Sequence, residues 1–135
     1  MEKMNNKGFS LVELIVVIAI MAVLVGVLAP QFIKYVESSR RSTDVSNAQN
    51  IQSAILADIA EATWSGTNDS WYIVDETNKP TTLGEAPKIK GNKDNNGGYF
   101  YAKANSNLGT CDVATDNAGT YTLTTDSGVS DYKAD

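Results

Sequence analysis

The chain has 135 residues, a formal net charge of −5, one cysteine and no histidine. This length suits one modest domain, the acidic balance argues against binding of nucleic acid by bulk charge, and a lone cysteine cannot form an intramolecular disulfide. The lack of histidine removes the commonest general base and the commonest neutral metal ligand. An enzyme is therefore the least expected class, and no catalytic residue, metal or cofactor is predicted.

The first eight residues, MEKMNNKG, are short, polar and slightly basic, and a long apolar run follows them. This run is longer than the roughly 7 to 15 apolar residues of an ordinary secretory signal. Cleavage near its far end, around 26–29, would place Pro30 directly after the scissile bond, where proline lacks an amide hydrogen. Gly8 is the more attractive site, because a missing side chain lets a protease approach the backbone. We therefore expect residues 1–8 to be a removed leader.

Residues 11–29 form an apolar stretch in which Glu13 is the only charge. A helix of about 20 such residues spans a bilayer. A carboxylate in this segment is costly and calls for a partner, although the positive end of the helix dipole would also favour an anion in the first turn. After cleavage, the new amino group of Phe9 would stand one helical turn from Glu13. Pairing of these charges between neighbouring chains would fix their axial register, so Glu13 is interpreted as an assembly residue.

Gly26 and Pro30 lie one turn apart near the end of the apolar run. Proline removes a backbone hydrogen bond, so a kink or a locally melted helix is expected there. The alternative is that the membrane span simply ends at Pro30. The next polar stretch places Glu37 at helical spacing from Arg40 and Arg41, with which it can pair. Basic residues flank the span on both sides, so their count does not fix its orientation.

The stretch KGFSLVELIVVIAIMAVLVGVLAPQF, residues 7–32, resembles the prepilin signal of type IV pilins and of their relatives, the pseudopilins of type II secretion and competence systems. The features that carry the resemblance are a short leader ending in Gly8, the following Phe9, Glu13 four residues later, and a proline near the end of the apolar helix. The resemblance implies that a prepilin peptidase cleaves between Gly8 and Phe9 and methylates the new amino group of Phe9. It also implies a cytoplasmic leader and an exported carboxyl-terminal part.

Beyond the span, apolar residues recur at spacings of three and four, which predicts that the same helix continues with one buried face. These residues are Val45, Ala48, Ile51, Ile55, Ile59 and Ala62. A coiled-coil dimer is the alternative, although the apolar face covers few heptads. Turn residues at 65–70 end the helix. Three segments rich in aromatic and β-branched residues, 71–74, 98–104 and 119–125, are predicted to be strands of a small antiparallel sheet over the isoleucine face.

The expected fold class is therefore α+β, with one long N-terminal helix packed on a small antiparallel sheet, as in pilins. The expected parts are a leader, a membrane and assembly helix, an amphipathic half of the same helix, and a globular head with variable loops. Their boundaries are predicted at residues 1–8, 9–33, 34–64 and 65–135.

Several residues of the head resemble ion ligands without completing a site. Asn92, Asp94 and Asn96 match the first half of a calcium loop, but Lys103 occupies the position of the bidentate glutamate, so an Asn-Gly turn is favoured. Four later aspartates could hold an ion only if their loops converge, and solvated loop acids are the default. These are Asp112, Asp116, Asp126 and Asp131.

Cys111 is interpreted as a small buried hydrophobe rather than a reactive thiol. Some pilins pin their carboxyl-terminal loop with a disulfide, which a chain with one cysteine cannot do. The resemblance therefore implies a pilin of the Gram-positive kind, whose loops are held by packing alone.

Together these observations predict a structural subunit that polymerises through its apolar helix into a type IV pilus and serves adhesion, twitching motility or biofilm formation. Its implied partners are copies of itself in a helical filament, the prepilin peptidase, the pilus assembly platform in the cytoplasmic membrane, and membrane lipid before assembly. The expected location is the cytoplasmic membrane as a single-pass prepilin, and then the extracellular filament. One alternative is a pseudopilin of a secretion or DNA-uptake system; another is a membrane-anchored binding domain that never polymerises.

Overall fold

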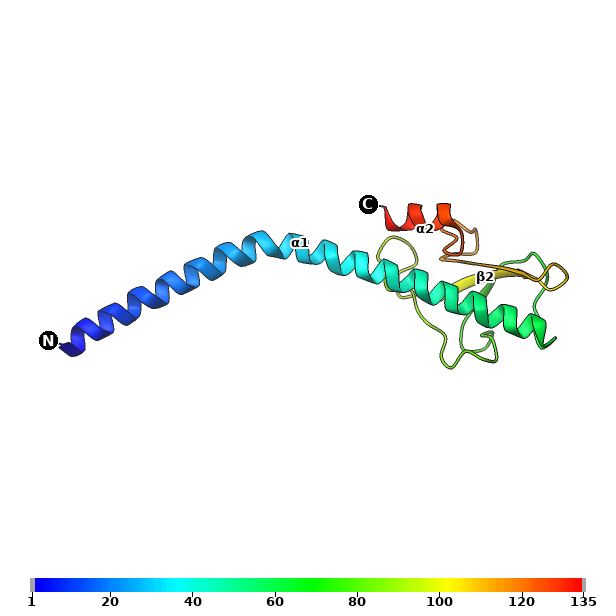
Figure 1. Ribbon diagram of the computed structural model, residues 1–135, viewed down its shortest axis with the longest axis horizontal. Coiled ribbons are helices and arrows are strands. Elements are labelled where there is room, and N and C mark those ends of the chain that lie inside the picture. The colour runs from blue at the N-terminus through cyan, green and yellow to red at the C-terminus, as the bar shows by residue number, and fades with distance from the viewer. Residues whose placement is uncertain (1, 135) are drawn as a thin grey trace. The chain divides into compact units, whose positions relative to one another are not determined.

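The computed structural model describes residues 2–134, with side chains from Ser10 onward. It has one long helix, a three-stranded sheet and a short second helix (Figure 1). In chain order the elements are α1 (Glu2–Ala60), β1 (Tyr72–Val74), β2 (Phe100–Asn105), β3 (Thr110–Ala114) and α2 (Asp126–Lys133). The predicted α+β class, with a long apolar N-terminal helix and a small antiparallel sheet, is confirmed. The chain divides into two compact units, Met1–Val36 and Glu37–Asp135, and the second is called the head below.

Helix α1 continues without interruption through Pro30. A locally melted helix at this proline, one of the two forms of the expected disturbance, is therefore not found, and the helix does not end there. The proline lacks only one amide donor, and the neighbouring turns of the helix keep their own hydrogen bonds. A bend at Pro30 stays a prediction.

The carboxyl end of α1 is closed by backbone hydrogen bonds from the residues that follow it to carbonyls of its last turn. The Ala62 N–H donates to the Ile59 carbonyl at 3.1 Å, and the Thr63 N–H donates to the Asp58 carbonyl at 2.9 Å. Ala62 has a φ of 58°, so it occupies the left-handed position that ends many helices. Ala62 was expected on the buried helical face and is instead exposed beyond the helix end.

The sheet has the order β1-β2-β3, and both pairs of neighbours are antiparallel. Alternate side chains of β2 point inward, since Phe100, Ala102 and Ala104 are buried while Tyr101 and Lys103 are half-buried. The inward face packs against the isoleucine face of α1 in one core. The largest apolar members of that core are Ile51, Ile55, Val74, Ile89, Phe100, Val113, Leu123 and Tyr132.

The third strand is not where the sequence predicted it. β3 occupies Thr110–Ala114, whereas residues 119–125 form no strand of the sheet. They meet β3 through an isolated bridge between Ala114 and Thr122 and through a few hydrogen bonds, among them the Leu123 N–H to the Val113 carbonyl at 2.8 Å. A hydroxyl interrupts the pairing, because the Val113 N–H donates to Thr124 Oγ1 at 3.2 Å instead of to a backbone carbonyl. The prediction of a strand at 119–125 is therefore wrong.

Helix α2 follows directly from that segment. The side chain of Thr125 accepts the Gly128 N–H, which caps the first turn of α2. Threonine is common both in strands and at helix caps, so its β propensity misled the prediction here. The helix buries Tyr132 completely against the core.

Candidate assembly site

The first unit exposes an extended apolar surface. Every described side chain from Ser10 to Tyr35 is exposed, and the large apolar ones between Leu11 and Leu28 have 50–67% of their surface accessible. Among the described residues, α1 is the one helix long and apolar enough to cross a membrane, with a mean hydropathy of 3.1 over its most apolar window. The free energy decreases when lipid or protein covers such a surface and removes it from water.

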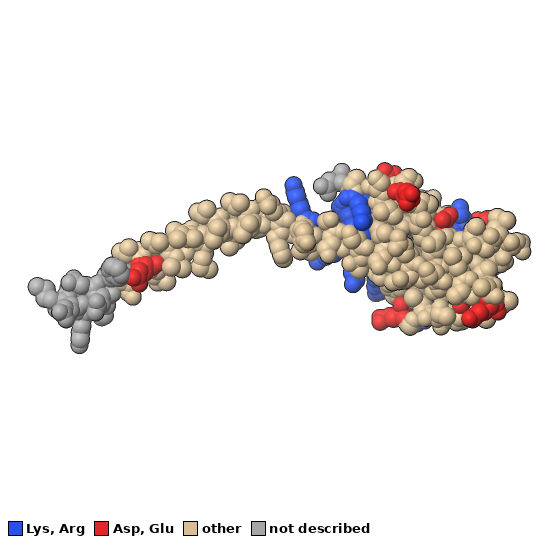
Figure 2. All heavy atoms as spheres, viewed as in Figure 1, with Lys and Arg blue, Asp and Glu red and all other residues tan. Residues whose placement is uncertain are grey.

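Glu13 is the only charged residue of the apolar stretch at 11–29. Figure 2 shows the same contrast, with one red patch next to the grey residues and only uncharged atoms after it as far as the first blue side chains. The Glu13 side chain is exposed and makes no hydrogen bond or ion pair with any residue whose side chain the structure describes. Its partner therefore has to come from the undescribed amino-terminal side chains, another molecule or water.

Two of the predicted site residues, Gly8 and Phe9, precede the residues whose side chains the structure describes. The cleavage between them, the methylation of Phe9 and the pairing of its amino group with Glu13 therefore stay predictions. Gly26, the other residue of the expected kink, faces open space, because a Cβ built there would meet no atom within 4 Å.

A second cluster of polar groups lies in the head, where α1 meets the carboxyl-terminal helix. Asp44 is completely buried, and its carboxylate accepts three hydrogen bonds. The donors are the Lys90 N–H at 2.8 Å, the Gly91 N–H at 2.7 Å and the Tyr132 hydroxyl at 2.6 Å. Burial and the hydrogen bond to Asp44 raise the pKa of Tyr132, so its hydroxyl remains a donor. Asp44 thus ties a loop and α2 to the first helix.

Arg41, one turn before Asp44, extends this cluster to the end of the chain. Its Nε donates to Glu37 Oε1 at 2.9 Å, an ion pair at helical spacing that confirms one of the two predicted pairings of Glu37. One of its terminal nitrogens donates to the Ala134 carbonyl at 3.0 Å. Carbonyls at the carboxyl end of a helix favour a cation, so Arg41 holds the end of α2.

The cluster is packed so closely that only glycine fits at position 91. A Cβ built on Gly91 would lie 2.5 Å from the Tyr132 hydroxyl oxygen and 2.9 Å from Asp44 Oδ2. The carboxyl-terminal segment is therefore held by a buried network of hydrogen bonds as well as by apolar contacts. The expectation that packing alone holds the loops is wrong for this segment, because buried hydrogen bonds also hold it.

The family comparison concerns the amino-terminal segment. Residues 3–29 match the family model described as the prokaryotic N-terminal methylation motif. The chain carries a type IV pilin-like prepilin signal. No curated protein and no solved structure matches the chain. The prepilin motif and the apolar helix that it opens are consistent with processing by a prepilin peptidase, membrane anchoring and assembly into a pilus-like filament.

The residues that resembled a calcium loop form hydrogen bonds with other groups of the head. The Gly98 N–H donates to the Asn95 carbonyl at 2.9 Å, which confirms a turn at this place. Asp94 accepts a hydrogen bond from the Thr115 hydroxyl, and the Asn96 amide donates to two backbone carbonyls. The four later aspartates do not converge, since no group of three or more potential metal ligands occurs among the described residues.

Cys111 is buried, as the sequence interpretation expected. Burial and the nearby charge of Asp112 raise the pKa of its thiol to about 12. The thiol is therefore protonated at neutral pH and is a poor nucleophile.

The sequence analysis missed Asp44, and it missed the contacts of Arg41 beyond its pairing with Glu37, because charged residues on a helix are usually exposed. Both lie on the buried face, at helical spacings of four and seven residues before Ala48, yet the predicted apolar face began at Val45. The sequence signal that could have found them is this spacing, which places two charged side chains on the same helical face as the buried apolar residues.

Proposed function

We propose that this chain is the structural subunit of a type IV pilus. A prepilin peptidase cleaves it between Gly8 and Phe9 and methylates Phe9. The mature subunit waits in the cytoplasmic membrane and then passes, through the pilus assembly platform, into an extracellular helical filament of its own copies. The role is structural rather than catalytic, because the chain has no histidine and its only thiol is buried and protonated. Adhesion or twitching motility follows from the filament.

The observation that carries this proposal is the lone Glu13 in the exposed and otherwise uncharged apolar stretch at 11–29, which lies within the prepilin motif. A simple membrane anchor needs no carboxylate at this position, and the charge raises the free energy of insertion. In a filament core the carboxylate can set the axial register of neighbouring subunits, because the amino group of a neighbouring Phe9 neutralises it only when the two chains are correctly aligned. Glu13 therefore favours a polymerising subunit over a non-polymerising anchored domain.

The first experiment determines the amino terminus of the mature protein. Intact-mass and peptide mass spectrometry on cells that contain the native peptidase should give a chain that starts at Phe9 and carries one added methyl group. A chain that still starts at Met1, or one cut near Ala29, would contradict the proposal. Either result would instead favour a membrane-anchored or secreted domain that does not polymerise.

The second experiment tests assembly itself. Glu13→Gln removes the charge and retains the size of the side chain, so it should leave membrane insertion and cleavage intact and strongly reduce surface filaments. Glu61→Gln, at an exposed position just after α1, is the matched control and should assemble normally. Filaments at wild-type abundance in both variants would contradict the role of Glu13.

Filament length separates the pilus from a pseudopilus, since both kinds of subunit use the prepilin signal. Long fibres seen by electron microscopy of cells with native expression levels, and labelled by an antibody against the head, would support the pilus. Antibody labelling confined to the cell envelope, without external fibres, would instead favour a pseudopilin.

A further inference from the structure

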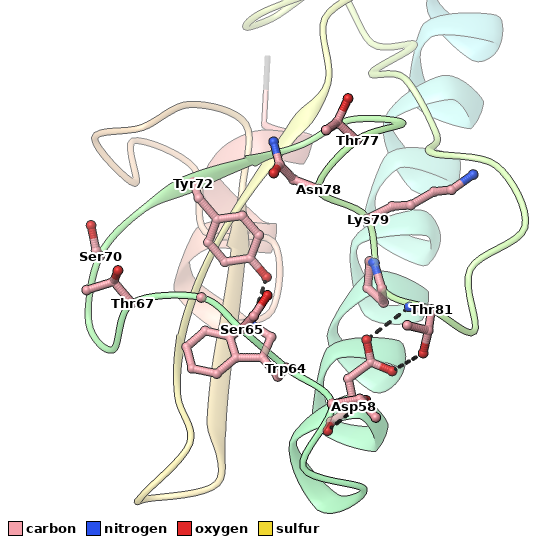
Figure 3. A pocket seen from close by; sticks show the side chains of 13 residues that line it. Asp58, Trp64, Ser65, Thr67, Ser70, Tyr72, Thr77, Asn78, Lys79 and Thr81 are labelled. Carbon is pink, nitrogen blue, oxygen red and sulfur yellow. Dashed lines mark hydrogen bonds between the residues drawn. The ribbon is translucent and has the colours of Figure 1, made fainter.

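A cavity of about 340 Å³ opens in the head beside the carboxyl end of α1 (Figure 3). Its wall comes from three places: the last turns of α1, the loop from Thr63 to Ser70 that leads to Tyr72 in β1, and the loop at 77–81 after β1. The volume falls in the lower part of the range of roughly 300 to 1,000 Å³ that is usual for small-ligand sites. The cavity is distinct from the apolar stretch of α1 at 11–29 and from the Asp44 cluster, because it shares no lining residue with either.

Trp64 and Tyr72 form the aromatic side of the cavity, opposite Asn78, Lys79 and Thr81 in Figure 3. The Trp64 Nε1–H donates to the Tyr72 hydroxyl at 3.2 Å, so each ring fixes the other. Burial raises the pKa of Tyr72, and the hydroxyl therefore stays protonated and keeps its own O–H donor at neutral pH.

The loop backbone is held tightly against this aromatic pair at Gly66. A Cβ built there would come within 2.5 Å of Trp64 Cζ2, so the close approach requires glycine. Trp64 also packs against the head core while remaining partly exposed, so the side chain has little freedom to move. Aromatic side chains fixed in this way lose little conformational entropy when a ligand binds.

The two ionised groups in the wall already have partners inside the head. The Asp58 carboxylate accepts the Thr81 N–H at 2.9 Å and the Thr81 hydroxyl at 2.6 Å. The Lys79 ammonium donates to Glu76 Oε2 and to the Gly84 carbonyl, both at 2.6 Å. Because both groups already use hydrogen bonds inside the head, the polar atoms left for a ligand are mainly uncharged hydroxyls, which favours a neutral ligand.

Hydroxyl groups supply the remaining polar atoms of the wall. The side chains of Ser65, Thr67, Ser70 and Thr77 are exposed and make no hydrogen bond to any other residue that the structure describes. Each hydroxyl can both donate and accept. Rigid aromatic surface combined with adaptable small hydroxyls is the composition of surfaces that recognise polar ligands.

We propose that this cavity binds a neutral saccharide of one or two sugar units. A pyranose has an apolar C–H face and a rim of hydroxyls that donate and accept, which complements an aromatic pair ringed by serine and threonine hydroxyls. The inference goes beyond the proposed function and does not depend on it, because the cavity belongs to a single head. If no saccharide binds, the proposal of filament assembly still stands. If no filament forms, the proposal of saccharide binding still stands.

The test uses the full chain in phosphatidylcholine nanodiscs, which avoids detergents with sugar headgroups. The chain has two tryptophans, and Trp71 does not line the cavity, so Trp71→Phe leaves Trp64 as the only indole reporter. This protein is titrated with maltose, cellobiose, lactose and N,N′-diacetylchitobiose while tryptophan fluorescence is recorded. At least one of these disaccharides should give a saturable change, with a dissociation constant on the order of 1 mM or below.

A matched pair of substitutions locates the binding site. Thr77 lines the cavity and Thr82 does not, although both are exposed threonines of the same loop. In the Trp71→Phe background, Thr77→Arg should fill the opening and weaken binding by about tenfold or more, whereas Thr82→Arg should change it by less than about twofold. Circular dichroism should show both variants folded. Lack of a saturable change with all four sugars, or equal binding by the two arginine variants, would overturn the proposal.

Discussion

Tyr132→Phe is the sharpest test of the Asp44 cluster, because it removes one oxygen atom and leaves the ring in place. The Tyr132 hydroxyl donates to Asp44 Oδ2 at 2.6 Å, and both side chains have no accessible surface. The ring also packs against Tyr121, with centroids 5.5 Å apart, and phenylalanine preserves that contact. Any loss of stability therefore reports the hydrogen bond to the buried carboxylate.

The magnitude follows from the charge of the acceptor. A hydrogen bond to a charged group contributes about 1.5 to 3 kcal/mol. In the variant, Asp44 retains the N–H donors of Lys90 and Gly91, so the loss should lie near the middle of that range, at about 2 kcal/mol. For a unit the size of the head, 1 kcal/mol lowers the melting temperature by roughly 4 to 8 °C, so we expect a decrease of about 8 to 16 °C.

The assay is thermal and urea unfolding of the full chain in nanodiscs, followed by near-ultraviolet circular dichroism of the head. Tyr101→Phe is the matched control, since the Tyr101 hydroxyl makes no hydrogen bond to another described residue and its loss should cost less than about 0.5 kcal/mol. If Tyr132→Phe unfolds within about 0.5 kcal/mol of the native chain, the network around Asp44 does not anchor the carboxyl-terminal helix.

Three further predictions concern other residues of the head. Gly91→Ala should lower the free energy of unfolding in urea by about 1 to 3 kcal/mol, because the added Cβ would lie 2.5 Å from the Tyr132 hydroxyl. Asp58→Ala removes both acceptors of Thr81 and should speed amide hydrogen exchange in the loop at 77–81. The Cys111 thiol should react with iodoacetamide at pH 8 only after unfolding in urea. Because its pKa is raised from 9.0 to about 12, its contribution to the free energy of unfolding should be complete below pH 9 and lost as the pH rises toward 12. Cys111→Ala should reduce that alkaline loss in the same urea titration.

The elements that the sequence predicted correctly are those with a local periodic cause. The spacing of Ala48, Ile51 and Ile55 depends only on helical geometry, so the continuation of α1 beyond the span could be predicted without knowledge of its partner. The three consecutive aromatic residues at 99–101 likewise predicted β2 almost in place, because strand propensity is a local property. The exposed apolar helix with Glu13 needed no tertiary information either.

The parts that could not be predicted depend on contacts between distant segments. Tyr132 lies 88 residues from Asp44, and Gly91 lies 47 residues from it, so no local pattern announces their hydrogen bonds. The wrong strand at 119–125 has the same origin, since Thr124 and Thr125 use their hydroxyls to end a ladder and to cap a helix. Propensity alone does not distinguish a threonine that packs in a strand from one that bonds a backbone amide.

The two units differ in how many of their polar and apolar groups find partners within the chain, and this difference separates folding of the head from assembly through the apolar helix. Among the residues whose side chains the structure describes, no buried side-chain nitrogen or oxygen lacks a hydrogen-bond partner, and the carboxylates of Asp44 and Asp58 both accept hydrogen bonds from within the head. The first unit has the opposite character, with its apolar side chains uncovered and Glu13 without a described partner. A head that is complete by itself should fold in a monomer, whereas the helix ahead of it gains its covering only from lipid or from other copies. Substitutions in the Asp44 cluster should therefore change unfolding, and substitution of Glu13 should change assembly without changing the melting of the head.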